Sequence, residues 1–178
     1  MKFKQFIGFA YRAIVVQTLT YFVAGLLAST LLDYAAKWGQ EIMAIYMRPI
    51  THPLVMAGPL LQIGRGLVFA LALIPFYEAI FKRKLGWLAL WGLFLGFAIL
   101  SPVSAAPGSI EGMIYTNLPF GYHFFGWPEV FAQTLAFCLL LYYWENHPEK
   151  KWLTWLLTIC YVLIAALLIM GLLVTYGA

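Results

Sequence analysis

Hydrophobic positions along the chain gather into long apolar runs, separated by short stretches that hold most of the polar residues. Each run is close to or above the roughly 20 residues that an α-helix needs to cross a hydrocarbon core. The pattern therefore predicts five membrane-spanning helices, of which the fourth is the shortest. The predicted spans are 10–32, 54–81, 85–105, 128–144 and 152–175.

The stretches between these runs are of two kinds. "FKRKLGW" and "ENHPEKKW" are short and polar, so they predict tight turns between antiparallel neighbouring helices. Residues 34–53 mix apolar and charged side chains, which suits a short helix at the membrane interface that ends before Pro49. Residues 101–127 are rich in proline and glycine and yet apolar, which predicts a cap over the outer end of the bundle.

Composition strengthens the membrane assignment. Of the 178 residues, 63% are hydrophobic and only 10% are charged, against about 25% in a soluble domain. The mean hydropathy is +0.85. A soluble fold of this size could not bury so much apolar surface. We therefore expect an all-α integral membrane protein with one polytopic domain, 1–178, and the two cysteines, Cys138 and Cys160, as packing residues.

The distribution of cations predicts an orientation, because positively charged loops stay in the cytoplasm. Eight cations fall on the side of the N-terminus and two on the opposite side: Lys2, Lys4, Arg12, Lys82, Arg83, Lys84, Lys150 and Lys151 against Lys37 and Arg48. We expect the N-terminus inside and the C-terminus outside, in a bacterial cytoplasmic membrane. Cations at the boundaries attract anionic lipids, so the net charge of +4 does not indicate nucleic-acid binding. Arg12 is expected to extend toward the inner headgroups.

Arg65 is the remaining cation, in the otherwise apolar segment "GPLLQIGRGLVF". It lies about 16 Å below the outer start of its predicted helix, near the centre of a core about 30 Å thick. A central arginine costs about 2.5–3.5 kcal/mol on the most lenient scale, so it needs a partner or water. Gln62 lies one turn outward, and Gly64 and Gly66 favour close approach by another helix.

No predicted neighbour of Arg65 within the membrane is negative. The candidates there are Gln17, Thr18, Thr20, Gln133 and Thr134. The nearest carboxylates, Asp33, Glu111 and Glu129, lie toward the outer side. Two alternatives follow: Arg65 pairs with Glu111, Glu129 or backbone carbonyls in a structural network, or it lies in a cavity that receives an anion.

The outer side gathers the other candidate residues for binding: Arg48, His52, Glu111, His123 and Glu129. They show no HExxH spacing, so a zinc site is not predicted. The serines near residue 105 lack the GxSxG pattern of a nucleophile. No cofactor is identified by these residues.

We therefore expect binding of an anionic or amphipathic small molecule, or of a lipid headgroup, from the non-cytoplasmic side. Arg65 and Gln62 would form the buried part of this site, and the five outer residues would form its mouth. Two alternatives remain at this stage. One is an accessory subunit of a larger membrane complex or homo-oligomer, and the other is an outer-leaflet lipid-modifying enzyme that depends on Glu111, His123 or Glu129.

Overall fold

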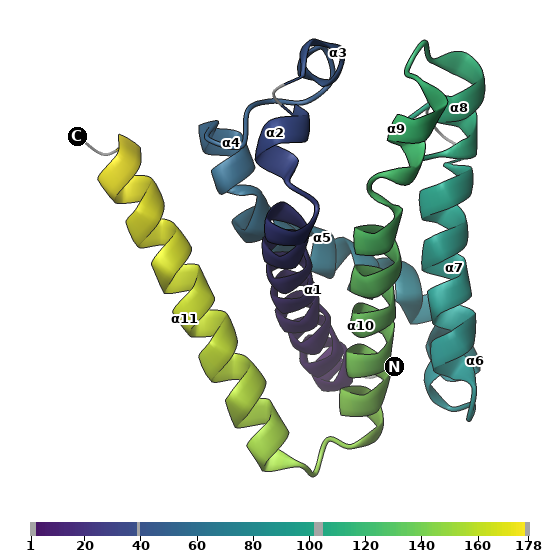
Figure 1. Cartoon of the computed structure of the whole chain (residues 1–178). Coiled ribbons are helices and arrows are strands. Elements are labelled where there is room, and N and C mark those ends of the chain that lie inside the picture. The colour runs from purple at the N-terminus through teal and green to yellow at the C-terminus, as the bar shows by residue number, and fades with distance from the viewer. Residues whose placement is uncertain (1–2, 39, 102–104, 177–178) are drawn as a thin grey trace.

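A computed structural model describes residues 3–38, 40–101 and 105–176 of the chain (Figure 1). Every regular element in these residues is helical, as the sequence predicts. The elements are α1 (Phe3–Leu31), α2 (Tyr34–Trp38), α3 (Glu41–Ala44), α4 (Pro53–Met56), α5 (Gly58–Leu73), the 3₁₀ turn η1 (Ile74–Phe76), α6 (Tyr77–Phe81), α7 (Gly86–Leu100), α8 (Ile110–Tyr115), α9 (Phe120–Phe124), α10 (Trp127–Asn146) and α11 (Lys151–Tyr176). Two parts of the predictions lie outside the described residues. They are Lys2, one of the cations that predict the orientation, and residues 102–104, which belong to the predicted third span and cap.

Four helical segments are long and apolar enough to cross a membrane: Phe3–Leu31, Gly58–Phe81, Phe120–Asn146 and Lys151–Tyr176. These correspond to the first, second, fourth and fifth predicted spans. The fourth, expected to be the shortest, is in fact carried by the 20-residue helix α10. The third prediction is only partly met, because α7 has 15 residues and is about 22 Å long.

The early end of α7 has a local cause. Ser101 adopts a left-handed conformation with φ of 41°, and its N–H donates to the carbonyl of Phe97. The next residue in the sequence is Pro102, which disfavours helical geometry in the residue before it. The helix therefore ends about five residues before the predicted boundary.

The helix α1 is at the centre of the packing and contacts α5, α10 and α11. Its contact with α5 is close because Gly66 faces the α1 backbone. A Cβ atom at Gly66 would lie 2.6 Å from the Cα of Ile14. The expected close approach at the glycines is thus confirmed for Gly66, whereas Gly64 has no such neighbour. Large buried side chains complete the core, among them Phe9, Phe81, Phe137 and Trp144.

The short helices α2, α3, α4, α8 and α9 all lie at one end of the molecule, together with the last turns of α11 (Figure 1). The turns at 82–85 and 147–150 lie at the opposite end, where α1 begins. Residues 34–53 form α2, α3 and the start of α4, so the single interfacial helix expected there is replaced by short pieces. In this view α11 diverges from the bundle, and Leu153 is its buried residue.

Arg12 departs from the expectation that it extends toward the headgroups. Its Nη1 atom donates to Oε2 of Glu145 at 2.6 Å, and the two side chains are 20% and 8% exposed. The Tyr77 hydroxyl donates to the other oxygen of Glu145 at 2.5 Å. The Glu145 carboxylate on α10 therefore pairs with Arg12 on α1. The two residues are 133 positions apart, so the sequence did not predict this ion pair.

Candidate functional site

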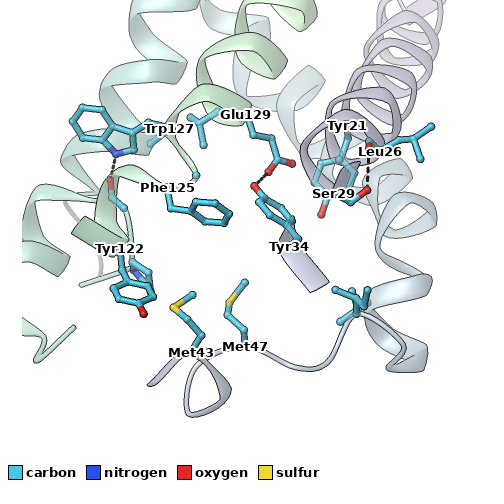
Figure 2. Close-up of a pocket in the computed structure, with 18 of the residues that line it drawn as sticks. Tyr21, Leu26, Ser29, Tyr34, Met43, Met47, Tyr122, Phe125, Trp127 and Glu129 are labelled. Carbon is cyan, nitrogen blue, oxygen red and sulfur yellow. Dashed lines mark hydrogen bonds between the residues drawn. The ribbon is translucent and has the colours of Figure 1, made fainter. Parts of the chain in front are cut away.

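A cavity of about 700 Å³ lies at the end of the bundle that carries the short helices (Figure 2). It is bounded by the last turns of α1, the 34–56 region, the end of α7, the 107–126 region and the first turn of α10. Its wall is mainly apolar and aromatic. The lining side chains include Phe22, Leu26, Met43, Met47, Ile50, Val55, Met56, Ile99, Phe125 and Val130. This volume falls within the range of about 300–1,000 Å³ that ligand pockets occupy.

His123 is a residue of the wall with a buried hydrogen-bonding atom that has no partner among the described residues. It lies on α9, which begins after Pro119, and its side chain is 1% exposed. The N–H of Gly108 donates to its Nδ1 atom at 3.2 Å. Because Nδ1 accepts, a neutral imidazole must carry its proton on Nε2. Among the described residues Nε2 has no hydrogen-bond partner, and His123 is one of the residues that line the cavity.

The loop before α8 fixes this histidine. Gly108 has φ of +88°, a left-handed conformation that suits glycine. Its carbonyl accepts a hydrogen bond of 2.7 Å from Nε1 of Trp127, which comes from the first turn of α10. Figure 2 shows this bond at the edge of the cavity. One glycine therefore joins His123 and Trp127 through its N–H and its carbonyl, and this holds the imidazole in one orientation.

Glu129 provides the acidic side of the cavity. It lies in the first turn of α10, where a carboxylate interacts favourably with the helix dipole. The Tyr34 hydroxyl donates a short hydrogen bond to Oε2 of Glu129 (Figure 2). Burial, and then the hydrogen bond to Glu129, raise the pKa of Tyr34, so the phenol stays protonated and remains a donor. The Tyr34 ring also packs on Phe125, with ring centroids 5.1 Å apart.

The predicted site residues fall into separate groups. His123 and Glu129 line the cavity. Arg48 and His52 contact each other, with 2.9 Å between Nη1 and Nε2, but they are not part of its wall. Glu111 lies in the first turn of α8, also outside the wall.

Gln62 belongs to a buried polar network in the middle of the bundle. Its Oε1 accepts from Nε2 of Gln17 at 3.0 Å, and its own Nε2 donates to the carbonyl of Gly58 at 3.1 Å. Gln133 in turn donates to Oε1 of Gln17 at 3.4 Å. Gln17 therefore contacts both Gln62 and Gln133, and the network joins α1, α5 and α10.

Arg65 does not join Gln62 in this network. Its side chain is exposed, and it forms no hydrogen bond or salt bridge with the residues that the structure describes. Pairing with Glu111, Glu129 or a backbone carbonyl, one of the two alternatives above, is thus not what the structure shows. Tyr21, on the cavity wall, lies close enough to Arg65 and Glu129 for the charges of both to act on its hydroxyl.

Sequence reasoning identified His123 and Glu129 but missed the groups that position them. Tyr34, Gly108 and Trp127 carry no motif, and Tyr34 is 95 residues away from its partner. Within the described residues no group of three His, Cys, Asp or Glu side chains is placed to hold a metal ion. The chain matches no protein-family model, no curated protein and no solved structure, so the geometry of the site alone bears on function.

Proposed function

We propose that the protein binds an amphipathic, lipid-like molecule in the cavity between α1, α9 and α10. The apolar part of this ligand would lie against the methionine and aromatic wall, and an acceptor oxygen of its polar head would receive a hydrogen bond from Nε2 of His123. The observation that carries the proposal is the buried Nε2–H of His123, which lacks a partner among the described residues. Leaving such a donor unpaired costs about 1–3 kcal/mol.

The charges around the cavity define the chemistry of the polar head. No Lys or Arg side chain belongs to the described wall, so a full anionic charge would find no direct counter-ion there. Glu129 already accepts from Tyr34, which leaves its second carboxylate oxygen for a hydroxyl or ammonium group. A head that combines a neutral ester oxygen with a hydroxyl or ammonium group fits His123 and Glu129 together. An amphipathic ligand is therefore favoured over a simple anion.

A membrane topology accompanies this proposal. The four long helices and α7 would make five crossings, with α7 as a short fifth span. With the N-terminus inside and the C-terminus outside, the cavity faces the non-cytoplasmic leaflet. The basic turns at 82–85 and 147–150 lie at the end opposite the cavity, which supports this orientation under the positive-inside rule. A ligand would then enter from the outer leaflet or from the space beyond it.

The experiment compares His123→Asn with the wild-type protein by native mass spectrometry after gentle release from the source membrane. Asparagine can still accept from the Gly108 N–H but has no donor at the place of Nε2. We expect a lipid-like adduct on the wild type, with its affinity reduced about 5- to 100-fold in the variant. His52→Asn is the matched control, because His52 lies outside the cavity wall. Equal adduct retention in both variants, or no adduct on the wild type, would overturn the proposal.

A further inference from the structure

One face of α5 is exposed although it lies within a membrane-spanning segment. The residues Leu61, Gly64, Arg65 and Val68 follow the spacing i, i+3, i+4 and i+7, so they share one side of the helix. All four are exposed, and we call them the Arg65 face. The opposite side, with Gln62 and Gly66, is buried against α1.

The contacts with α1 give the depth of the Arg65 face. Gln62 pairs with Gln17, and Gly66 lies against Ile14, so the two antiparallel helices run alongside each other. Arg65 is therefore level with the α1 backbone close to Ile14. Since the 29 residues of α1 centre on Gln17, Arg65 lies within a few ångströms of the middle of the span.

At this depth Arg65 lacks an ion-pair partner among the described side chains. Half of a hydrocarbon core about 30 Å thick separates the midplane from the headgroups, which is farther than one arginine side chain extends. A lipid phosphate is therefore out of reach, and no described side chain forms a salt bridge with Arg65. Exposure of this cation to acyl chains is therefore unfavourable. A carboxylate presented at the same depth would remove that cost.

A second copy of this chain has no such carboxylate to offer. Each acidic side chain is either at an end of the molecule or already engaged: Asp33, Glu41 and Glu111 near the outer end, Glu78 and Glu149 near the inner end, Glu129 with Tyr34 and Glu145 with Arg12. Parallel copies in one membrane keep the same depths. The counter-charge must therefore come from a different protein.

We propose that the Arg65 face binds a transmembrane helix of another membrane protein, which carries an Asp or Glu near the middle of its span. Gly64 contributes to the fit, because a Cβ atom there would meet nothing within 4 Å and the backbone is open to close approach. Leu61 and Val68, 62% and 61% exposed, supply apolar contacts on either side of the ion pair. This interaction is independent of the cavity and its ligand.

The test uses a synthetic leucine-rich transmembrane peptide with one central Asp, mixed with the full-length protein in phosphatidylcholine vesicles. Association is measured by energy transfer between dyes on the peptide and on the protein. Two control peptides carry Leu in place of the Asp, or the Asp near the peptide end. We expect the central-Asp peptide to bind the wild type at least about tenfold more tightly than it binds Arg65→Met. Arg65→Lys should retain most of the association, and Arg48→Met should behave as the wild type does.

Two results would overturn the proposal: equal binding of the three peptides, or undiminished binding of the central-Asp peptide to Arg65→Met. If Arg65→Met fails to fold, the comparison of peptides on the wild type and on Arg65→Lys still decides the question. A photocrosslinker at Val68 in the source membrane gives a second readout. The crosslinker should capture a transmembrane helix with a central Asp or Glu, and the yield of this product should be lower in Arg65→Met. A crosslinked product with a second copy of this chain would contradict the proposal.

Discussion

Replacing Gly66 with alanine should weaken the packing of α5 on α1. The new Cβ would lie 2.6 Å from the Cα of Ile14 and 3.1 Å from the carbonyl oxygen of Ala13. Carbon atoms pack favourably at about 3.5–4.0 Å, so the two helices must move apart by about 1 Å. The neighbouring atoms belong to the α1 backbone, which cannot turn aside as a flexible side chain would.

The magnitude follows from two opposing effects. Overpacking of a close contact costs about 1–3 kcal/mol, while alanine in a helix is favoured over glycine by up to about 1 kcal/mol. Gly64→Ala, two residues earlier on the same helix, receives only the second effect because nothing lies within 4 Å of its Cβ. The free energy of unfolding of Gly66→Ala should thus be about 1–3 kcal/mol lower than that of Gly64→Ala.

The two variants can be compared by unfolding in mixed detergent micelles. Cys138 is fully buried, so its reaction with a thiol dye reports unfolding of the core in a Cys160→Ser background. A difference of 1 kcal/mol corresponds to about 2–4 °C in Tm for a chain of this size. If Gly66→Ala were as stable as Gly64→Ala, the close approach of α1 and α5 would be refuted.

Three further predictions concern polar contacts, and each is measured as a change in Tm or in the free energy of unfolding. Arg12→Gln should lower the free energy of unfolding by about 1–3 kcal/mol, less than the loss of a fully buried ion pair, because the Arg12 side chain is 20% exposed. Adding Glu145→Gln to this variant should recover part of the lost stability, because it removes the unpaired carboxylate. Gln17→Leu should lower the free energy of unfolding by about 0.5–2 kcal/mol, because Oε1 of Gln62 loses its donor. The double variant Gln17→Leu/Gln62→Leu should have a free energy of unfolding closer to that of the wild type. The pKa of the Tyr34 phenol is higher in the folded protein than its value of about 10 in the unfolded chain. The contribution of the protonated phenol to stability is therefore fully present below about pH 10 and is lost as the pH rises toward the folded pKa. Tyr34→Phe should therefore reduce the loss of Tm between pH 9 and pH 11, and an unchanged pH profile would contradict the buried hydrogen bond.

The sequence by itself determined the helical class and the membrane environment. Runs of about 20 apolar residues leave few alternatives to transmembrane helices, because lipid offers the backbone no hydrogen-bond partners. The positions of His123 and Glu129 at one end of the bundle also followed from the order of the spans. Both residues line the cavity, so part of its polar lining was predictable from residue type and chain position.

Only the tertiary structure decided which polar groups meet. Gln62 and Arg65 are three residues apart, and spacing alone placed them together, yet the contact with α1 buries Gln62 and leaves Arg65 exposed. Tyr34 reaches Glu129 across 95 residues. Hydropathy is a local property and fixes each helix in the membrane, whereas the rotation of a helix about its axis depends on close contacts with its neighbours, such as Gly66 against α1. That rotation determines which polar side chains face the cavity, the core or the lipid.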